Sequence, residues 1–266
     1  MKRIFISTDI EGVTGVTSWC ETEYGGQGYD WACRQMSLET AAACKAVLRA
    51  GYQPVVKDGH GSALNIDPDL LPRGTELIRG WMVSPYGMMA GLDETFSGVV
   101  YIGYHAKAGS NGSPLAHTVE EPNFNWIKVN GQIASEFSLN ADLADQMGVP
   151  SLFISGDADI CADAEKVYPG IEALPVKKCI GNATWNMTPE EAVEKIEEKV
   201  FRVCSSLPAA RTLESEYTME IYFRQHTDAK NAAWYPGAEK IDGHRVAYQA
   251  ETPLELAVAR MFMTGL

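Results

Sequence analysis

The 266-residue chain lacks several features that mark whole classes of proteins. No run of apolar residues reaches the ~18 that a membrane-spanning helix needs. The first residues, MKRIFIST, have a basic tip but too short an apolar stretch for a secretory leader, whose apolar core takes about 7–15 residues. We therefore predict a cytoplasmic protein that does not bind membranes.

The sequence also has no excess of basic residues. Lys and Arg number 22 against 35 Asp and Glu, which gives a formal net charge of −13, and no basic stripe is present. Nucleic acids attract positive patches, so we expect none as a partner. The six cysteines never form a C-x-x-C pair. This disfavours a thiolate zinc site and, without a leader, predicts free thiols.

What is present indicates an α/β fold. Hydrophobic residues make up 45% of the chain, which is ample for a core. Short apolar runs alternate with segments of helical periodicity, as in a largely parallel sheet with flanking helices. After about residue 205 the pattern is strand, helix, strand, helix. We therefore predict an α/β catalytic region over residues 1–205 and a smaller C-terminal α+β unit over 206–266, with an approximate boundary.

Polar side chains follow three of the predicted strands. The strand over residues 3–8 runs into Asp9 and Glu11, the one over 52–58 into His60, and the one over 98–104 into His105. Ligands of open α/β sheets bind beyond the carboxyl ends of the strands. Two acids with one residue between them share a face of an extended strand, where they repel each other unless a cation lies between them.

These donors predict a metal site. Oxygen and nitrogen donors without a thiolate suit Zn²⁺, Mn²⁺ or Fe²⁺. Glu136 adds a fifth donor at the start of a predicted helix, although the helix dipole explains an acid there equally well. One catalytic zinc usually takes three protein ligands, so five donors favour two ions that share a carboxylate and activate water.

Three further histidines have weaker assignments. His117, in the polar loop after His105, is either an active-site residue or a side chain that shapes the pocket. His226 and His244 belong to the C-terminal unit, and we predict surface or packing roles for them. The segment WCETEYGGQGY at 19–29 is either a plain connection or a loop that covers the site.

Five short motifs occur in a familiar order. They are S-T-D-I-E-G at 7–12, D-G-H at 58–60, G-Y-H-A-K-A at 103–108, A-H-T at 116–118 and S-E-F-S-L-N-A at 135–141. With them the chain resembles the D-aminopeptidase (DppA) family, peptidase family M55. The similarity continues more weakly toward the C-terminus, in NAAWYPGAEKID.

The resemblance implies a cytoplasmic binuclear zinc aminopeptidase, with two Zn²⁺ per subunit, that forms a ring-shaped homo-oligomer, and it suggests a decamer. Its substrates would be short peptides with an N-terminal D-amino acid such as D-Ala. The family's metal ligands carry over onto Asp9, Glu11, His60, His105 and Glu136, with Asp9 as the bridge. Its further active-site histidine carries over onto His117.

One residue departs from the family pattern. The family has D-S-H where this chain has Asp58-Gly59-His60. The change removes a hydroxyl near the metal without touching a ligand, so it bears on substrate fit.

Two other functions stay open. Another two-metal amidohydrolase or a phosphoesterase would use the same ligands. A phosphoesterase also needs positively charged side chains to bind phosphate, and the strand-end loops offer mainly Lys57 and Lys107. A non-catalytic, metal-stabilised binding protein would hold the metal without an open water position. The preference for D-residues rests on the resemblance alone.

Overall fold

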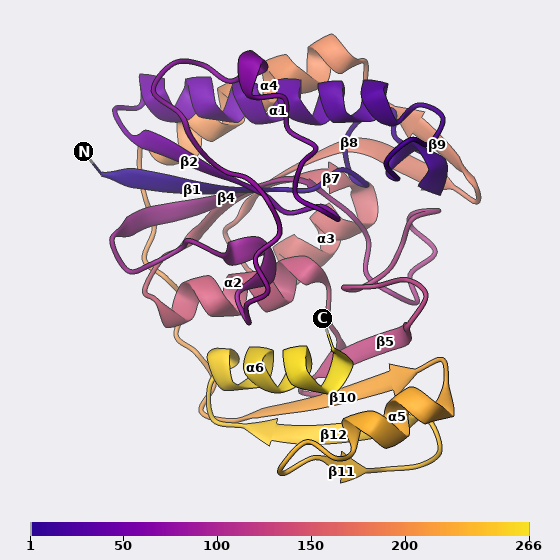
Figure 1. Ribbon diagram of the computed structural model, residues 1–266. Coiled ribbons are helices and arrows are strands. Elements are labelled where there is room, and N and C mark those ends of the chain that lie inside the picture. Colours follow the sequence, from indigo (N-terminus) through magenta and orange to yellow (C-terminus); the bar gives the residue numbers. More distant parts are fainter. Residues whose placement is uncertain (1, 266) are drawn as a thin grey trace.

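Two sheets organise the computed structural model, which describes residues 2–265 (Figure 1). The larger sheet has the order β3-β2-β1-β4-β7-β8-β9, and the smaller has the order β11-β12-β10-β5-β6. The strands of the larger sheet are β1 (Arg3–Thr8), β2 (Gln53–Asp58), β3 (Glu76–Ile78), β4 (Phe96–Tyr104), β7 (Ser151–Asp157), β8 (Glu172–Ile180) and β9 (Ala183–Asn186). Those of the smaller sheet are β5 (Phe124–Val129), β6 (Gln132–Ile133), β10 (Tyr217–Phe223), β11 (Glu239–Lys240) and β12 (Arg245–Ala250).

The helices fill the connections between these strands. They are α1 (Tyr29–Arg49), α2 (Glu136–Gln146), α3 (Ala158–Val167), α4 (Pro189–Cys204), α5 (His226–Ala232) and α6 (Pro253–Thr264). Short 3₁₀ turns are η1 (Trp19–Glu21), η2 (Pro68–Leu70) and η3 (Gly87–Met89). Within residues 2–265, no helix combines the length and apolar character that crossing a bilayer requires.

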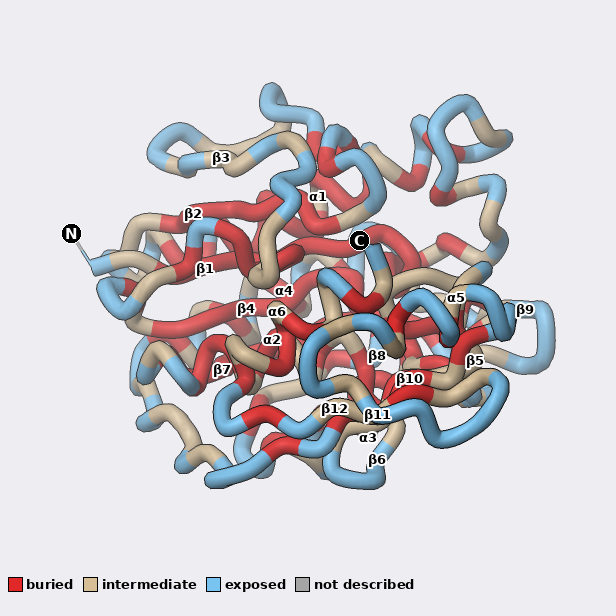
Figure 2. The backbone as a smooth tube through the Cα atoms, turned by 60° about the horizontal axis from the view of Figure 1, so that its bottom comes forward, coloured by how far each residue is buried: buried red, intermediate tan, exposed pale blue. Residues whose placement is uncertain are grey.

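The larger sheet is parallel from β3 to β8, and only β9 joins it antiparallel. Helices α1 and α4 cover one face and α2 and α3 the other, as Figure 1 shows. The central strands β2, β1, β4 and β7 are therefore buried on both faces, which explains their nearly continuous apolar runs (Figure 2). The predicted α/β class, with a largely parallel sheet and flanking helices, is confirmed.

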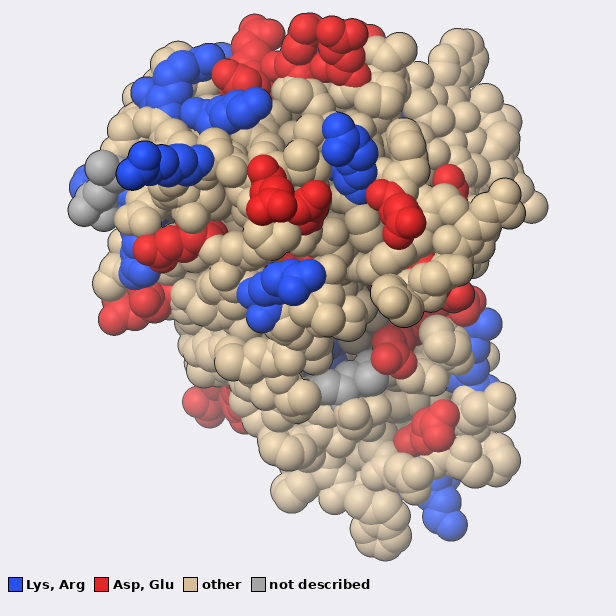
Figure 3. All heavy atoms as spheres, turned by 45° about the horizontal axis from the view of Figure 1, so that its top comes forward, with Lys and Arg blue, Asp and Glu red and all other residues tan. Residues whose placement is uncertain are grey.

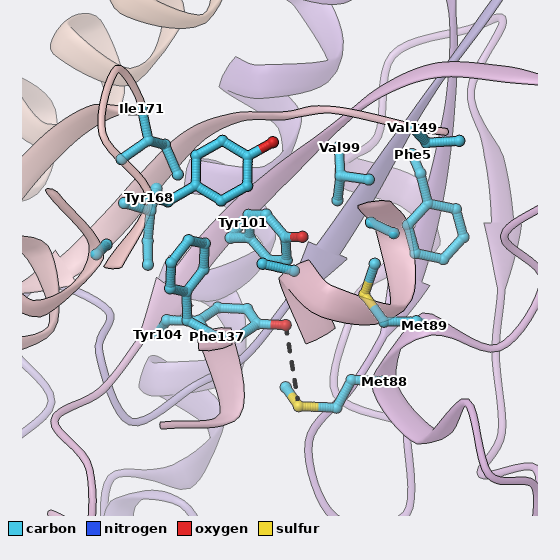
Figure 4. Packing of buried hydrophobic residues seen from close by; sticks show 14 of the residues in the cluster. Phe5, Met88, Met89, Val99, Tyr101, Tyr104, Phe137, Val149, Tyr168 and Ile171 are labelled. Carbon is cyan, nitrogen blue, oxygen red and sulfur yellow. Dashed lines mark hydrogen bonds between the residues drawn. The ribbon is translucent and has the colours of Figure 1, made fainter. Parts of the chain in front are cut away.

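An aromatic cluster under the sheet fixes α2 against β4 (Figure 4). The ring of Tyr101 meets those of Tyr104 and Phe137 edge to face, at centroid distances of 5.3 Å and 5.0 Å. Asn140 of α2 donates to the hydroxyl of Tyr104 at 3.0 Å. Because Phe137 is buried in this cluster, the first turn of α2 lies beside the carboxyl end of β4.

The smaller sheet draws on two parts of the chain. β10 pairs with β12 on one side and with β5 on the other, all antiparallel. β5 and β6 form a hairpin whose turn, Asn130-Gly131, has φ of 48° and 77°, as expected for an Asn-Gly connection. This sheet therefore includes strands from within residues 1–205, and the division into two units at residue 205 remains a prediction.

The charged side chains and the thiols can be followed in the structure. On the face drawn in Figure 3, several basic side chains gather at the upper left, and acidic side chains lie next to them and across the rest of the face. All six cysteines are free thiols.

Candidate metal centre

Asp9, Glu11 and His60 meet where β1 and β2 end side by side. The His60 Nδ1 atom lies 3.4 Å from Asp9 Oδ1 and 3.1 Å from Glu11 Oε2. β1 ends at Thr8, so the argument that put both acids on one face of an extended strand is wrong. They lie in the turn after β1, and the turn directs both carboxylates toward the same imidazole.

His105, at the end of β4, joins this group to Glu136 at the start of α2. Its Nε2 atom lies 3.5 Å from Asp9 Oδ2 and 3.5 Å from Glu136 Oε2. The His117 ring stacks on that of His105 at 4.0 Å, and its Nε2 atom lies 3.6 Å from Glu136 Oε1. All six residues singled out from the sequence therefore meet in one cluster. Glu136 faces into it instead of serving only the helix dipole.

Backbone carbonyls set the tautomer of each imidazole. His60 Nε2 donates to Thr22 O at 2.8 Å, His105 Nδ1 to Ala106 O at 3.0 Å, and His117 Nδ1 to Leu115 O at 2.9 Å. A carbonyl oxygen only accepts, so each of these nitrogens carries a hydrogen. In the neutral rings the second nitrogen then presents a lone pair to the carboxylates, the arrangement found around metal-binding histidines.

Several atoms in the cluster lack a hydrogen-bond partner among the described residues. Asp9 Oδ2, Glu11 Oε2 and His105 Nε2 are buried and unpartnered, whereas buried polar atoms are nearly always paired. Two overlapping groups, Asp9–Glu11–His105 and His105–His117–Glu136, each bring one donor atom per residue within 4.8 Å of the others. Lone pairs gathered this closely fit a divalent cation.

The pKa values of the cluster reflect this crowding. Burial and the nearby Glu11 raise the pKa of Asp9 to about 8. Burial also acts to raise the pKa of Glu136, but positive charge on His105 and His117 outweighs it and lowers the pKa to about 2. Burial acts to lower the pKa of His105, yet Glu136 and Asp9 raise it to about 10. The carboxylates thus require positive charge beside them, from protons or from metal ions.

The cluster opens into a cavity of about 880 Å³. The segment 19–29 contributes to its wall, since Trp19, Thr22 and Glu23 line it and the Trp19 ring meets that of His117 edge to face at 5.3 Å. The segment is therefore a wall of the site and not only a connection. Residues of α2 and α6 complete the lining, among them Asn140 and Arg260, which the sequence argument did not find.

Comparison with known proteins identifies the family. The family model of the M55 peptidases, described as D-aminopeptidase, matches residues 1–263. The chain belongs to this family. It is a hydrolase of peptide bonds, an aminopeptidase, as the sequence predicted.

A sequence match and a structural match both cover the chain almost end to end. A D-aminopeptidase from Bacillus subtilis (strain 168) is 28% identical over 269 residues, covering 99% of this chain and 97% of the relative. The solved structure of the Zn-dependent D-aminopeptidase DppA from Bacillus subtilis, described as a self-compartmentalizing protease, superposes with a TM-score of 0.92 at 27% identity. That superposition covers 99% of this chain and 97% of the other.

Two glycines in the turns after β1 and β2 allow the loops to approach closely. A Cβ atom at Gly12 would lie 1.7 Å from Tyr104 O, so only glycine lets the turn after β1 cross the end of β4. A Cβ atom at Gly59, where the resemblance implies a serine, would lie 2.7 Å from Thr8 O. This chain therefore packs β1 and the D-G-H turn too closely for a serine without a shift of the backbone.

A buried lysine supports the turn that carries Glu11. Lys177 of β8 is 3% exposed, and its ammonium donates to the backbone carbonyls of Glu11, Val13 and Val16, the last two at 3.1 Å and 2.6 Å. Thr14, in the same turn, donates its backbone N–H to the buried Glu39 carboxylate at 3.1 Å. These bonds fix the backbone on which Glu11 is mounted.

Replacing this lysine tests the support. Lys177→Met keeps the volume of the side chain but leaves three backbone carbonyls without their donor. Each buried carbonyl that lacks a hydrogen bond costs about 1–3 kcal/mol of stability. We expect a loss of about 3 kcal/mol in the free energy of unfolding, measured by urea titration, and a 10- to 100-fold weaker zinc affinity, as for other residues that orient metal ligands. Lys178→Met is the matched control, because Lys178 is exposed and stacks on Trp185. Equal effects of the two substitutions would contradict the assignment.

Proposed function

We propose that this M55 peptidase is a binuclear zinc aminopeptidase that releases an N-terminal D-amino acid, such as D-Ala, from short peptides. The observation that carries the proposal is the set of buried, unpartnered donors, Asp9 Oδ2, Glu11 Oε2 and His105 Nε2, that face one another. The zinc dependence of the structural relative supports zinc as the cation.

The proposed ligands are Asp9, Glu11, His60, His105 and Glu136. Asp9 suits the role of the bridge, because its Oδ1 atom faces His60 and its Oδ2 atom faces His105. Zn²⁺ bound by these residues would lower the pKa of a water molecule and polarise the scissile carbonyl. Glu136 Oε1 also accepts from the backbone N–H of Val119 at 2.7 Å, which holds the carboxylate in place.

His117 is proposed as the proton carrier of the reaction. Its Nδ1–H donates to Leu115 O, so its unprotonated Nε2 atom faces the cluster. The ring can therefore accept a proton at Nε2 first and donate it afterwards. We assign to it the proton released by the attacking water and its delivery to the leaving amine. Trp19 packs against the ring and limits its rotation.

Two lysines bear on the phosphoesterase alternative. Lys57 Nζ donates to the carbonyls of Asp58 and Gly80, and Lys107 pairs with Asp163. Neither side chain lines the cavity. The cations that the sequence offered for a phosphate are therefore engaged elsewhere, which favours a peptide substrate.

We further propose a cytoplasmic ring of identical subunits, in line with the self-compartmentalizing relative. Large apolar side chains are exposed on the C-terminal part of the chain, with Trp234 at 79% and Phe262 at 66%. Such residues are suited to contacts between copies. A ring of ten subunits predicts a mass near ten times 29.1 kDa in sedimentation analysis.

Hydrolysis of alanine dipeptides tests the function. The purified protein should cleave D-Ala-D-Ala faster than L-Ala-L-Ala, lose the activity after chelation, and regain it with Zn²⁺ but not with Mg²⁺, which prefers oxygen ligands. Metal analysis should give two zinc ions per subunit. Failure of a zinc-loaded sample to cleave either dipeptide would contradict the proposal, and faster cleavage of the L-peptide would overturn the stereochemical part.

A further inference from the structure

Among the Asp, Glu, Lys and Arg side chains that line the cavity over the cluster, all but one are acidic. Arg260 is the one Lys or Arg among the described residues that line it. The acidic residues that line it are Asp9, Glu11, Glu23, Glu120, Glu121, Glu136 and Asp142. A single guanidinium in such surroundings marks the place where the cavity accepts an anion.

Arg260 is carried by the face of α6 that forms one wall of the cavity. Pro253, Leu256, Ala257 and Arg260 all line it, and their spacing of three, four and seven residues places them on one side of the helix. α6 lies between the smaller sheet and the rest of the molecule, where it packs against α2 (Figure 1). The guanidinium thus belongs to the wall contributed by the C-terminal unit.

The guanidinium of Arg260 makes no ion pair or hydrogen bond with any residue in 2–265. Arg211, near the opposite end of α2, differs: it binds Asp142, Asp145 and the carbonyl of Val167. Burial lowers the pKa of Arg260, and Glu136 acts against this effect. A partly buried guanidinium without partners retains five donors in a planar fork that matches a carboxylate.

We propose that Arg260 binds the C-terminal carboxylate of the peptide substrate. The inference rests on the proposed function, because a short peptide brings one anion into the cavity, and that anion is its C-terminal carboxylate. With the scissile bond at the metal ligands and the carboxylate at α6, the enzyme selects peptides by length. A longer peptide, or one with a blocked C-terminus, leaves the guanidinium unpaired.

The test compares two substrates that differ only in this charge, D-Ala-D-Ala and D-alanyl-D-alaninamide. We expect the wild-type protein to favour the free acid by about 10- to 100-fold in kcat/KM, the range of a charge-assisted hydrogen bond. Arg260→Gln should remove this preference, mainly through KM, and leave the amide within about twofold of wild type. Arg260→Lys should restore part of the preference, because it keeps the charge without the fork.

Arg34→Gln is the matched control, since Arg34 is an exposed arginine on α1 away from the cavity. Its substitution should leave the preference and the zinc content unchanged. Equal loss on both substrates in Arg260→Gln would overturn the inference, as would a wild-type protein that cleaves the amide as fast as the acid. Either result would leave the proposed function standing.

If neither peptide is cleaved, the proposed function fails and calorimetric binding of the same two peptides decides the inference. Tighter binding of the acid, lost in Arg260→Gln, would support the carboxylate site. Equal binding of acid and amide would overturn it.

Discussion

Replacing Asp9 with asparagine (Asp9→Asn) is expected to lower kcat/KM on D-Ala-D-Ala by about 10³-fold or more. The two oxygens of Asp9 face different histidines, His60 and His105, at 3.4 Å and 3.5 Å. An asparagine keeps one oxygen and replaces the other with an amide nitrogen, which does not coordinate. The loss should exceed the 10- to 100-fold typical of residues that only orient ligands.

Although Asp9→Asn lowers activity, it should not lower the stability of the metal-free protein. Asp9 is 2% exposed beside the equally buried Glu11, and burial next to Glu11 raises its pKa to about 8. At neutral pH the metal-free fold must therefore protonate this carboxyl, and a neutral asparagine removes that cost. The metal-free variant should therefore be as stable as the wild type or more so. Zinc at 1,000 times its dissociation constant should stabilise the wild type by about 4 kcal/mol and the variant by much less.

Thermal unfolding with and without Zn²⁺, together with metal analysis, checks both effects. Asp159→Asn is the control, because Asp159 is an exposed acid near the same edge of the sheet but outside the donor cluster. A variant at Asp9 that retained two zinc ions and full activity would show that Asp9 is not the bridge.

The donors at the strand ends were predictable because their positions follow from sheet topology. β2, β1 and β4 are adjacent and parallel, so the residues that follow them must meet at one edge. The local argument for Asp9 and Glu11 was nevertheless wrong, since strand periodicity stops at Thr8. Their convergence depends on a turn whose path is set by Gly12 and Lys177, contacts far apart in sequence.

Other parts of the site leave no local signal. Lys177 lies in β8, a strand that the sequence analysis missed because Pro175 and two adjacent lysines lower its strand propensity. Arg260 follows Glu136 by more than a hundred residues and reaches the cavity only because α6 packs against α2. The periodicity of a helix predicts which face is buried, but not which neighbour that face meets.

His117→Ala is expected to lower kcat on D-Ala-D-Ala by about 10²- to 10⁴-fold, the usual contribution of a positioned acid or base. The zinc content should remain at two per subunit, because His117 is not among the proposed ligands. KM should change little, since the ring is assigned to proton transfer and not to substrate binding. Added imidazole should restore part of the activity by entering the space that the substitution leaves.

These readouts separate the proton carrier from the alternatives that the sequence left open. His226→Ala is the control, an exposed histidine of α5 away from the cluster, and should leave kcat unchanged. If His117→Ala lost one zinc ion, His117 would be a ligand, as its place in the His105–His117–Glu136 group permits. If it kept both zinc ions and nearly full turnover, the ring would only shape the pocket, and the proton would have to reach the leaving amine through Glu136 or water.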